Sequence, residues 1–363
     1  MIKNFTILTL FLIFVSGCFY NDPVPSDQNV WPVALPSTFE MDEELLLEMD
    51  SVISIDPNNG ISSVVIIKNG HLVYEKYYHG SDRRTLFELS GVSSSIVNVA
   101  LGRAIDLGLI TSVTDSIYKY LPEYNQIFED TPLKKNITFE HVMTMKSGLS
   151  WSEFSGGFDD LLSDNDKIIQ SEDWVEYLLS RPLDAYPGSR FAFNSAIAIL
   201  ISKVIEIQYE DSFSNFLTKE AFRDLNIDHV GIEVLGDNVN TAWGVSMTTL
   251  DLAKIGSVYL ENGNWFGKPF IDETYVESSK SIQTNIDYSN DFGWMWWRYA
   301  EQNMFLSFLA ENDIFFAAGT SNERMYIVPH LDLVVAITGT QEGEGFALSA
   351  PYVFRGYILG SLR

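Results

Sequence analysis

Four serines stand close together at the start of a stretch with helical apolar spacing, and they are the residues best suited to covalent chemistry. They are Ser90, Ser93, Ser94 and Ser95. A serine hydroxyl attacks a carbonyl well only when a neighbouring base takes its proton, and residues three or four apart share a helix face. No lysine or histidine stands at that spacing, and Glu88, the nearest carboxylate, would need a raised pKa to act as the base. Ser90 and Ser93 are therefore only fallback nucleophiles, and the commoner role of such serines is to cap a helix.

Metal and cofactor chemistry have no comparable basis in the sequence. The histidines are scattered, with no pair at metal-ligand spacing, at His71, His79, His141, His229 and His330. We expect these residues to have structural or surface roles. The sequence therefore predicts no metal site and no cofactor.

The composition is that of a folded, acidic protein. Of the 363 residues 46% are hydrophobic, which is ample for a large core and excludes wholesale disorder. The formal charge of −26 would repel nucleic-acid phosphates, so we exclude nucleic acid as a partner.

The single cysteine, Cys18, excludes an intrachain disulfide and ends an N-terminal targeting pattern. A weakly basic start and an apolar run over residues 5–15 precede Val15-Ser-Gly-Cys. This pattern resembles the lipobox of bacterial lipoproteins, in which cleavage leaves residue 18 lipid-modified. We predict a signal peptide over residues 1–17 and a lipid anchor that holds the chain to a membrane at the bacterial cell envelope, on the periplasmic or extracellular side. An ordinary cleaved signal peptide is the alternative.

The elements that must position the serines form one domain in this interpretation. Prolines and polar residues over 18–42 predict an extended tether, and residues 43–363 predict a single domain. An Asn69-Gly70 turn between apolar runs predicts a β-hairpin. Strands are predicted at 313–317, 324–328 and 333–338, and helices at 41–52, 91–109, 138–145, 172–180, 196–208, 213–224, 249–262 and 350–362. The predicted class is α+β, an α/β sandwich whose antiparallel sheet combines both chain ends, with a helical insert.

An ordered series of segments from about residue 45 onward resembles the beta-lactamase-related serine hydrolases and penicillin-binding proteins. The branch is that of class C beta-lactamases and 6-aminohexanoate-dimer hydrolase. The segments include Ala104-Ile-Asp-Leu-Gly-Leu-Ile, Met143-Thr-Met-Lys-Ser-Gly-Leu-Ser-Trp, Pro187-Gly-Ser-Arg-Phe, Met247-Thr-Thr-Leu-Asp-Leu-Ala-Lys and Gly293-Trp-Met-Trp-Trp. The resemblance implies a beta-lactamase/transpeptidase-like fold.

The resemblance also implies which positions should carry the chemistry, and at these the residues have changed. The ungapped register from Ala104 places Gly91 at the serine position and Ser94 at the lysine position. The tyrosine position holds Phe193, followed by Ser195, and the basic position of the last motif holds Thr320. Triad members act as a unit, so joint loss predicts little catalysis.

We therefore expect a catalytically inactive relative, a pseudoenzyme that binds a cell-wall peptide or another envelope protein. The alternatives are an active esterase, amidase or beta-lactam hydrolase with a non-standard nucleophile, and a purely structural envelope protein. Trp294 and Trp296 are expected to pack in the core, and they are also candidate pocket-lining residues if a strand runs through them and one indole reaches the rim.

Overall fold

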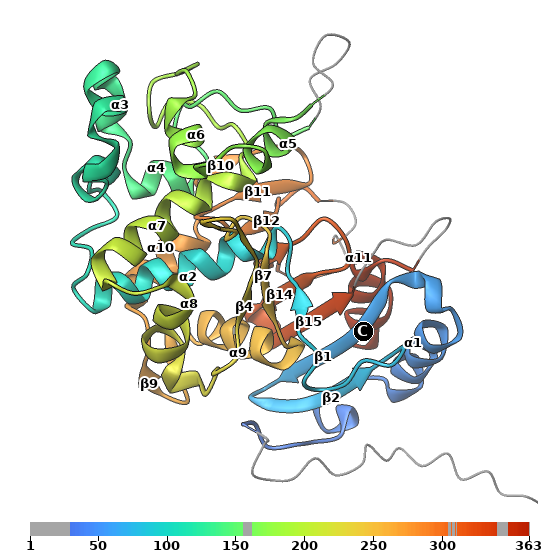
Figure 1. The fold of residues 1–363 in the computed structure, drawn as a ribbon. Helices are drawn as coiled ribbons and strands as arrows, with labels where there is room; N and C mark the ends of the chain where they lie inside the picture. The colour runs from blue at the N-terminus through green and yellow to red at the C-terminus, as the bar shows by residue number, and fades with distance from the viewer. Residues whose placement is uncertain are drawn as a thin grey trace, which may run out of the picture.

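The computed structural model describes residues 30–154, 162–303, 306, 309, 311–339 and 348–362. Its centre is an eight-stranded antiparallel sheet in the order β10-β11-β12-β13-β14-β15-β1-β2 (Figure 1). The predicted α+β class is confirmed. The strands are β1 Ile61–Lys68, β2 His71–Tyr77, β10 Thr284–Asn285, β11 Asn290–Phe292, β12 Trp297–Tyr299, β13 Phe315–Ala318, β14 Arg324–Val328 and β15 Leu333–Gly339.

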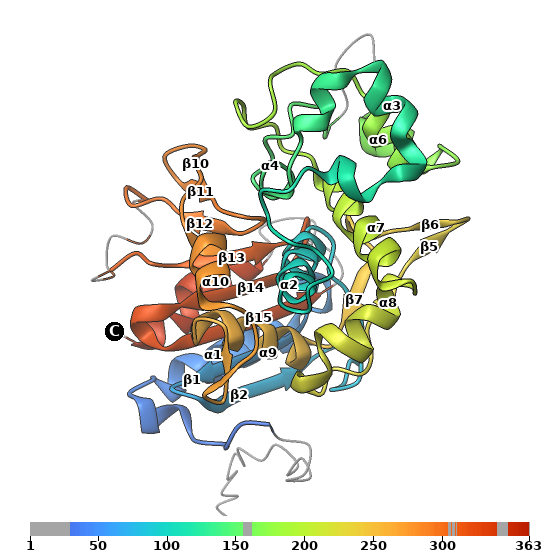
Figure 2. The same ribbon diagram turned by 90° about the vertical axis from the view of Figure 1, so that its left-hand side faces the viewer.

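The two ends of the chain meet inside this sheet. Strand β1 pairs antiparallel with both β2 and β15, so the first strand lies beside the last one (Figure 2). The hairpin between β1 and β2 turns at Asn69 and Gly70, whose φ angles are 50° and 67°, as a primed two-residue turn requires. The predicted hairpin and the predicted pairing of the chain ends are both confirmed.

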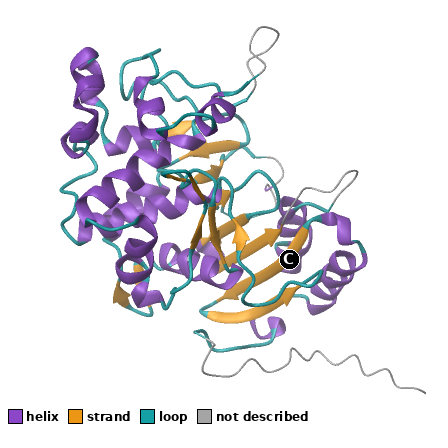
Figure 3. Ribbon diagram, in the orientation of Figure 1, coloured by secondary structure: helices purple, strands orange, loops and turns teal. Residues whose placement is uncertain are grey.

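Helices cover both faces of the sheet, which explains why its central strands β1 and β15 are buried along their whole length (Figure 3). On one face, Val65 and Ile67 belong to the same buried cluster as the helices α2, Val92–Asp106, and α9, Thr249–Leu260. On the other face, Val64 and Ile66 pack with α1, Glu43–Ile55, and with the C-terminal helical segment. That segment consists of α11, Ala350–Tyr352, a π-helical stretch, Val353–Ile358, and a final 3₁₀ turn, Gly360–Leu362.

A helical region extends beyond the sheet, with α3 and α6 at its far end and α2 and α7 nearer the strands (Figure 2). Its helices are α3 Asn125–Asp130, α4 Phe139–Met143, α5 Asp164–Ile169, α6 Trp174–Ser180, α7 Ala198–Tyr209 and α8 Phe213–Phe216, and α10 Glu273–Lys280 follows later in the chain. Short strands complete the fold: β3 Phe87–Glu88, β4 Gly231–Ile232, β5 Val234–Leu235, β6 Asn238–Val239, β7 Val245–Met247, β8 Asn264–Trp265 and β9 Lys268–Pro269.

Three predicted segments need correction. The helix predicted over 350–362 is divided into the α-, π- and 3₁₀-helical parts given above. The helix predicted over 213–224 divides into α8, a π-helical stretch, Leu217–Ala221, and a short 3₁₀ turn, Arg223–Leu225. The tether predicted over 18–42 cannot be extended as far as residue 42. Trp31 is only 3% exposed and packs edge-on against Trp265, and Val33 bridges to Leu72. The earlier part of that tether lies outside the described residues.

Candidate functional site

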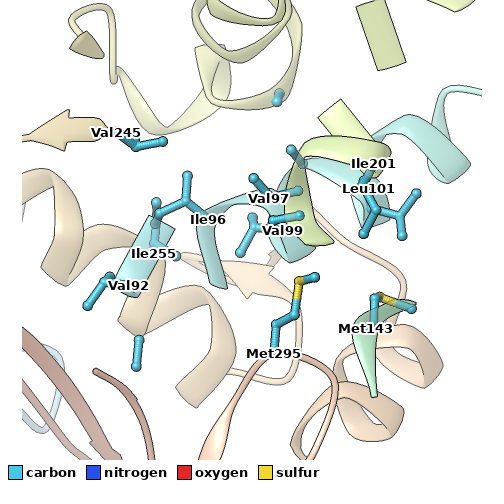
Figure 4. Close-up of a cluster of buried hydrophobic side chains, with 14 of the residues drawn as sticks. Val92, Ile96, Val97, Val99, Leu101, Met143, Ile201, Val245, Ile255 and Met295 are labelled. Carbon is cyan, nitrogen blue, oxygen red and sulfur yellow. The ribbon is translucent and has the colours of Figure 1, made fainter. Parts of the chain in front are cut away.

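The start of α2 is positioned by strand pairing and by burial. Strand β3 pairs with β7, and Leu89 donates its N–H to the carbonyl of Val245 at 2.8 Å. Val92, Ile96 and Val99 then anchor the helix in the core, with Met143, Val245 and Met295 around them (Figure 4). Gly91 is the N-cap of this helix, and no side chain caps it. The helix therefore owes its position to apolar packing rather than to the serine cap that its sequence predicts.

Gly91, at the family's serine position, is closely approached by the last residue of β13. A β-carbon built on Gly91 would lie 2.6 Å from the carbonyl oxygen of Ala318, whereas ordinary contacts begin at 3.4 Å. Gly319 also leaves little room, because a β-carbon there would meet Glu323 Oε2 and would lie 3.0 Å from the carbonyl oxygen of Leu89. The two backbone segments thus meet where the reactive side chain of a relative would begin.

Ser90 and Thr320 join these two segments by side-chain hydrogen bonds. The two hydroxyl oxygens lie 2.8 Å apart, and the backbone N–H of Thr320 donates to Ser90 Oγ at 3.2 Å. Ser90 has a φ of 48°, an uncommon conformation for a residue other than glycine. Its hydroxyl therefore has a hydrogen-bonding partner, but that partner is not a base.

The other serines of the turn are buried on α2. Ser93 Oγ accepts the N–H of Val245 at 3.3 Å, and Ser95 Oγ donates to the carbonyl of Met295 at 2.6 Å. Ser94 is 6% exposed and does not line the cleft described below. Ser93 is 0% exposed and its hydroxyl bonds to β7 in the interior of the protein, so of the two fallback nucleophiles only Ser90 lines the cleft.

A cavity of about 420 Å³ opens at this end of α2, and we refer to it as the cleft. It brings together Gly91, Phe193, Ser195 and Thr320, four of the five positions implied by the resemblance, together with Ser90. Its full lining is Glu88, Ser90, Gly91, Glu153, Asn165, Ile169, Phe193, Ser195, Trp243, Trp297, Ala318, Gly319 and Thr320.

A tight turn at Gly188 precedes Phe193 and sets the path of the chain toward the cleft. Gly188 has a φ of 85°, and a β-carbon on it would lie 2.6 Å from His141 Nε2, so this turn requires glycine. The following loop is tied to the 143–151 segment, since Ala192 donates its N–H to the carbonyl of Met145 at 2.8 Å. Lys146, in that segment, donates to the carbonyl of Gln283 at 2.8 Å and does not line the cleft.

The tryptophans of the 294–297 segment divide between the core and the cleft. Trp294 and Trp296 are buried at 5% and 0% exposure, and Trp296 Nε1 donates to Asn98 Oδ1 at 3.2 Å. The residue that lines the cleft is Trp297, whose ring lies 5.7 Å from that of Phe193. Core packing is thus the interpretation that fits Trp294 and Trp296. The chain turns at Met295, φ 59°, and the strand begins only at Trp297, so strand alternation does not extend back to residue 294.

Glu153, Asn165 and Trp243 line the cleft but were not predicted from the sequence. Glu153 accepts three hydrogen bonds: from Trp151 Nε1 at 2.9 Å, from the N–H of Ser195 at 3.0 Å and from Asn165 Nδ2 at 3.0 Å. Trp243 comes shortly before β7, the partner strand of β3. Its place two residues before that apolar strand is the only signal that could have suggested it.

The polar turn after β13 is fixed by its own side chains. Arg324 Nη1 donates to the carbonyls of Gly319, Ser321 and Glu323 at 2.7, 3.0 and 2.7 Å. Glu323 Oε2 accepts the N–H of Ser321 at 3.1 Å, and burial raises the pKa of the Glu323 carboxyl, with the Glu88 charge adding to the rise. The hydrogen bonds of Arg324 and Glu323 therefore fix the conformation of this turn and hold Thr320 in place.

The described part of the chain offers neither a metal-binding cluster nor a membrane-spanning helix. No cluster of three or more histidine, cysteine, aspartate or glutamate residues there has the arrangement of a metal site. No helix there is both long and apolar enough to cross a bilayer. Cys18 lies outside the described residues.

Comparisons with known proteins agree with this architecture. A family model described as beta-lactamase matches residues 60–355. A protein from Bacillus anthracis assigned as a 6-aminohexanoate-dimer hydrolase is 17% identical, with a TM-score of 0.66 over 92% of this chain and 87% of that one. EstCE1, a hydrolase with promiscuous acyltransferase activity, is 14% identical, with a TM-score of 0.67 over 88% and 99%. A penicillin-binding protein from Bacillus halodurans is 15% identical, with a TM-score of 0.62 over 84% and 96%.

At these identities the solved structures show a shared fold, whereas the family model covers most of the chain. The protein therefore belongs to the beta-lactamase family of serine hydrolases and has the beta-lactamase/transpeptidase-like fold.

Proposed function

We propose that this protein is a non-catalytic member of its family that binds a ligand or partner in the cleft. The observation that carries the proposal is the contact at Gly91. No side chain is present at the nucleophile position, and the carbonyl of Ala318 occupies the space that a β-carbon would need. An enzyme that relied on this position would need both the hydroxyl and the room for it.

The rest of the cleft supports the same conclusion. No lysine, histidine or tyrosine is among the described residues that line it. Two carboxylates do line it, but the described hydrogen bonds of the Ser90 hydroxyl are to Thr320 and not to either of them. The cavity nevertheless remains open and partly aromatic, as in a binding site. One structural relative is a penicillin-binding protein, which makes cell-wall peptide or another envelope protein the natural candidates for a ligand.

The direct test is reaction with a fluorophosphonate probe and with labelled penicillin, read by intact mass. We expect no covalent adduct on purified protein. An adduct that maps to Ser90 and disappears in Ser90→Ala would overturn the proposal.

The alternative is a working hydrolase that uses Ser90. In its favour, Ser90 lines the cleft in a left-handed backbone conformation, and residues in such conformations cluster at active sites. Against it, the hydroxyl is already engaged by Thr320. A screen of esters, amides and beta-lactams separates the two, because an active hydrolase exceeds the solvent background and Ser90→Ala returns it to that background.

A binding measurement distinguishes the proposed binding role from a purely structural one. Ligands of the folded state raise its melting temperature, so a thermal-shift screen with muropeptides should give a concentration-dependent rise if the cleft binds them. A Phe193→Ala variant, which removes one wall of the cleft, should lose that rise.

The membrane anchor is a separate part of the proposal and rests on the sequence around Cys18. Cells supplied with a labelled fatty acid should incorporate it into the wild type and not into Cys18→Ala. Equal incorporation into both would contradict the anchor.

A further inference from the structure

The described lining of the cleft contains two carboxylates, Glu88 and Glu153, and no lysine, arginine or histidine side chain. Arg324, which hydrogen-bonds to Gly319, is not among the lining residues. The three donors to the Glu153 carboxylate are an indole, a backbone amide and a side-chain amide, all of them neutral. Glu88 is exposed. A ligand that enters therefore meets two carboxylates and no compensating cation.

Aromatic rings complete the wall around these carboxylates. The rings of Phe193 and Trp297 are tilted by 38° with centroids 5.7 Å apart, and Trp243 also lines the cleft. All three are only partly buried, so part of their surface is open to a ligand. An aromatic face attracts a cation within about 6 Å of its centroid, most strongly when water is excluded.

Resting on the proposed binding role, we propose that the cleft selects ligands that present an organic ammonium group and rejects those that lead with a carboxylate. An ammonium placed between the rings and the two carboxylates gains both cation–π and Coulomb attraction. A carboxylate in the same place meets two like charges. A cell-wall peptide would accordingly enter by an amine-bearing side chain or amino end rather than by its carboxyl terminus.

Three probes of the same size test this selectivity: 3-phenylpropylamine, 3-phenylpropanol and 3-phenylpropionate. Binding is followed by the fluorescence of the tryptophans at two salt concentrations, 0.01 M and 1 M. The lower concentration screens charges only over about 30 Å, so electrostatic attraction in the cleft is strongest there. We expect the ammonium to bind at least about tenfold more tightly than the alcohol, which corresponds to about 1.4 kcal/mol. The carboxylate should bind more weakly than the alcohol. At 1 M salt the differences in affinity among the three probes should become smaller.

Two variants with the same change of charge locate the effect. Glu88→Gln should reduce the preference for the ammonium by about threefold or more while leaving the affinity for the alcohol unchanged. Glu48→Gln, on α1 at the opposite face of the sheet, should leave the preference as it is in the wild type. Phe193→Leu keeps an apolar side chain without a π face and should also weaken binding of the ammonium selectively.

The outcomes distinguish this inference from the proposed function. Carboxylate binding as tight as ammonium binding, or a preference that Glu88→Gln does not change, overturns the charge selectivity while the cleft remains a binding site. If none of the three probes binds, the inference is wrong. If muropeptides also give no thermal shift, the proposed binding function is wrong as well.

Discussion

Restoring the nucleophile by Gly91→Ser should damage this protein rather than reactivate it. The new β-carbon would lie 2.6 Å from the carbonyl oxygen of Ala318, and reaching an ordinary contact of 3.4 Å requires a movement of the backbone. That backbone belongs to β13, whose Ala318 is paired with Arg324 of β14 and cannot move alone. Overpacking of this kind typically costs about 1–3 kcal/mol.

The cost can be measured by urea unfolding and by melting temperature. With an unfolding entropy of about 2.1 cal/mol/K per residue, the same cost lowers the melting temperature of a 363-residue chain by roughly 1–4 °C. Gly91→Ala should cost a similar amount, because the β-carbon causes the clash. Gly356→Ala is the matched control: its nearest neighbour is 3.8 Å away, so we expect no loss, or a gain of up to about 1 kcal/mol.

The double variant Gly91→Ser with Ser94→Lys is the stricter form of this experiment. Ser94 is 6% exposed, so a lysine there must bury its amine beside a strained serine. Phe193 and Thr320 remain in place, and we expect no ester hydrolysis. A double variant as stable as the wild type that hydrolyses esters would show that the reasoning about the Ala318 contact is wrong.

Three further predictions concern the turn after β13 and Ser90. Arg324→Met removes three hydrogen bonds to carbonyls and should lower the free energy of unfolding by about 2–4 kcal/mol, measured by urea titration. A loss below about 0.5 kcal/mol would contradict the claim that these hydrogen bonds fix the turn. Burial raises the pKa of Glu323 in the folded state, so its stabilising contribution is full below the unfolded pKa of about 4.5 and is lost as pH rises through the folded pKa. Glu323→Gln should therefore flatten the fall in urea midpoint between pH 4.5 and 8, and an unchanged slope would argue against this assignment. Ser90→Ala should cost about 0.5–1.5 kcal/mol by the loss of its bonds to Thr320, and an unchanged urea midpoint would mean that this link does not stabilise the cleft.

The sheet and most helices follow from patterns that the chain carries locally. The Asn69-Gly70 turn specifies its hairpin, and the apolar runs at 324–328 and 333–338 become β14 and β15 with almost the predicted bounds. The division of the helix predicted at 213–224 could not be foreseen, since its π-helical stretch keeps the apolar residues Leu217 and Ala221 buried. Tertiary packing there overrides helical periodicity.

The positions that meet in the cleft could be predicted from the family motifs. Positions next to an unpredicted turn of the chain could not. Gly91, Phe193 and Thr320 meet in the cleft as the motifs implied. Trp297 lines the cleft and Trp294 does not. The left-handed backbone at Met295 interrupts the strand there, so the alternation of side chains that the sequence suggests does not hold on both sides of it. The contact between Gly91 and Ala318 joins residues more than two hundred positions apart, and no local pattern reports it.

The rate of ester hydrolysis by highly purified wild type and by Ser90→Ala tests most directly whether this fold has lost its chemistry. We predict that both rates equal the solvent background, because the Ser90 hydroxyl is hydrogen-bonded to Thr320 rather than to a base and the family's nucleophile position is a glycine. Turnover by the wild type that disappears when the Ser90 hydroxyl is removed would contradict that prediction.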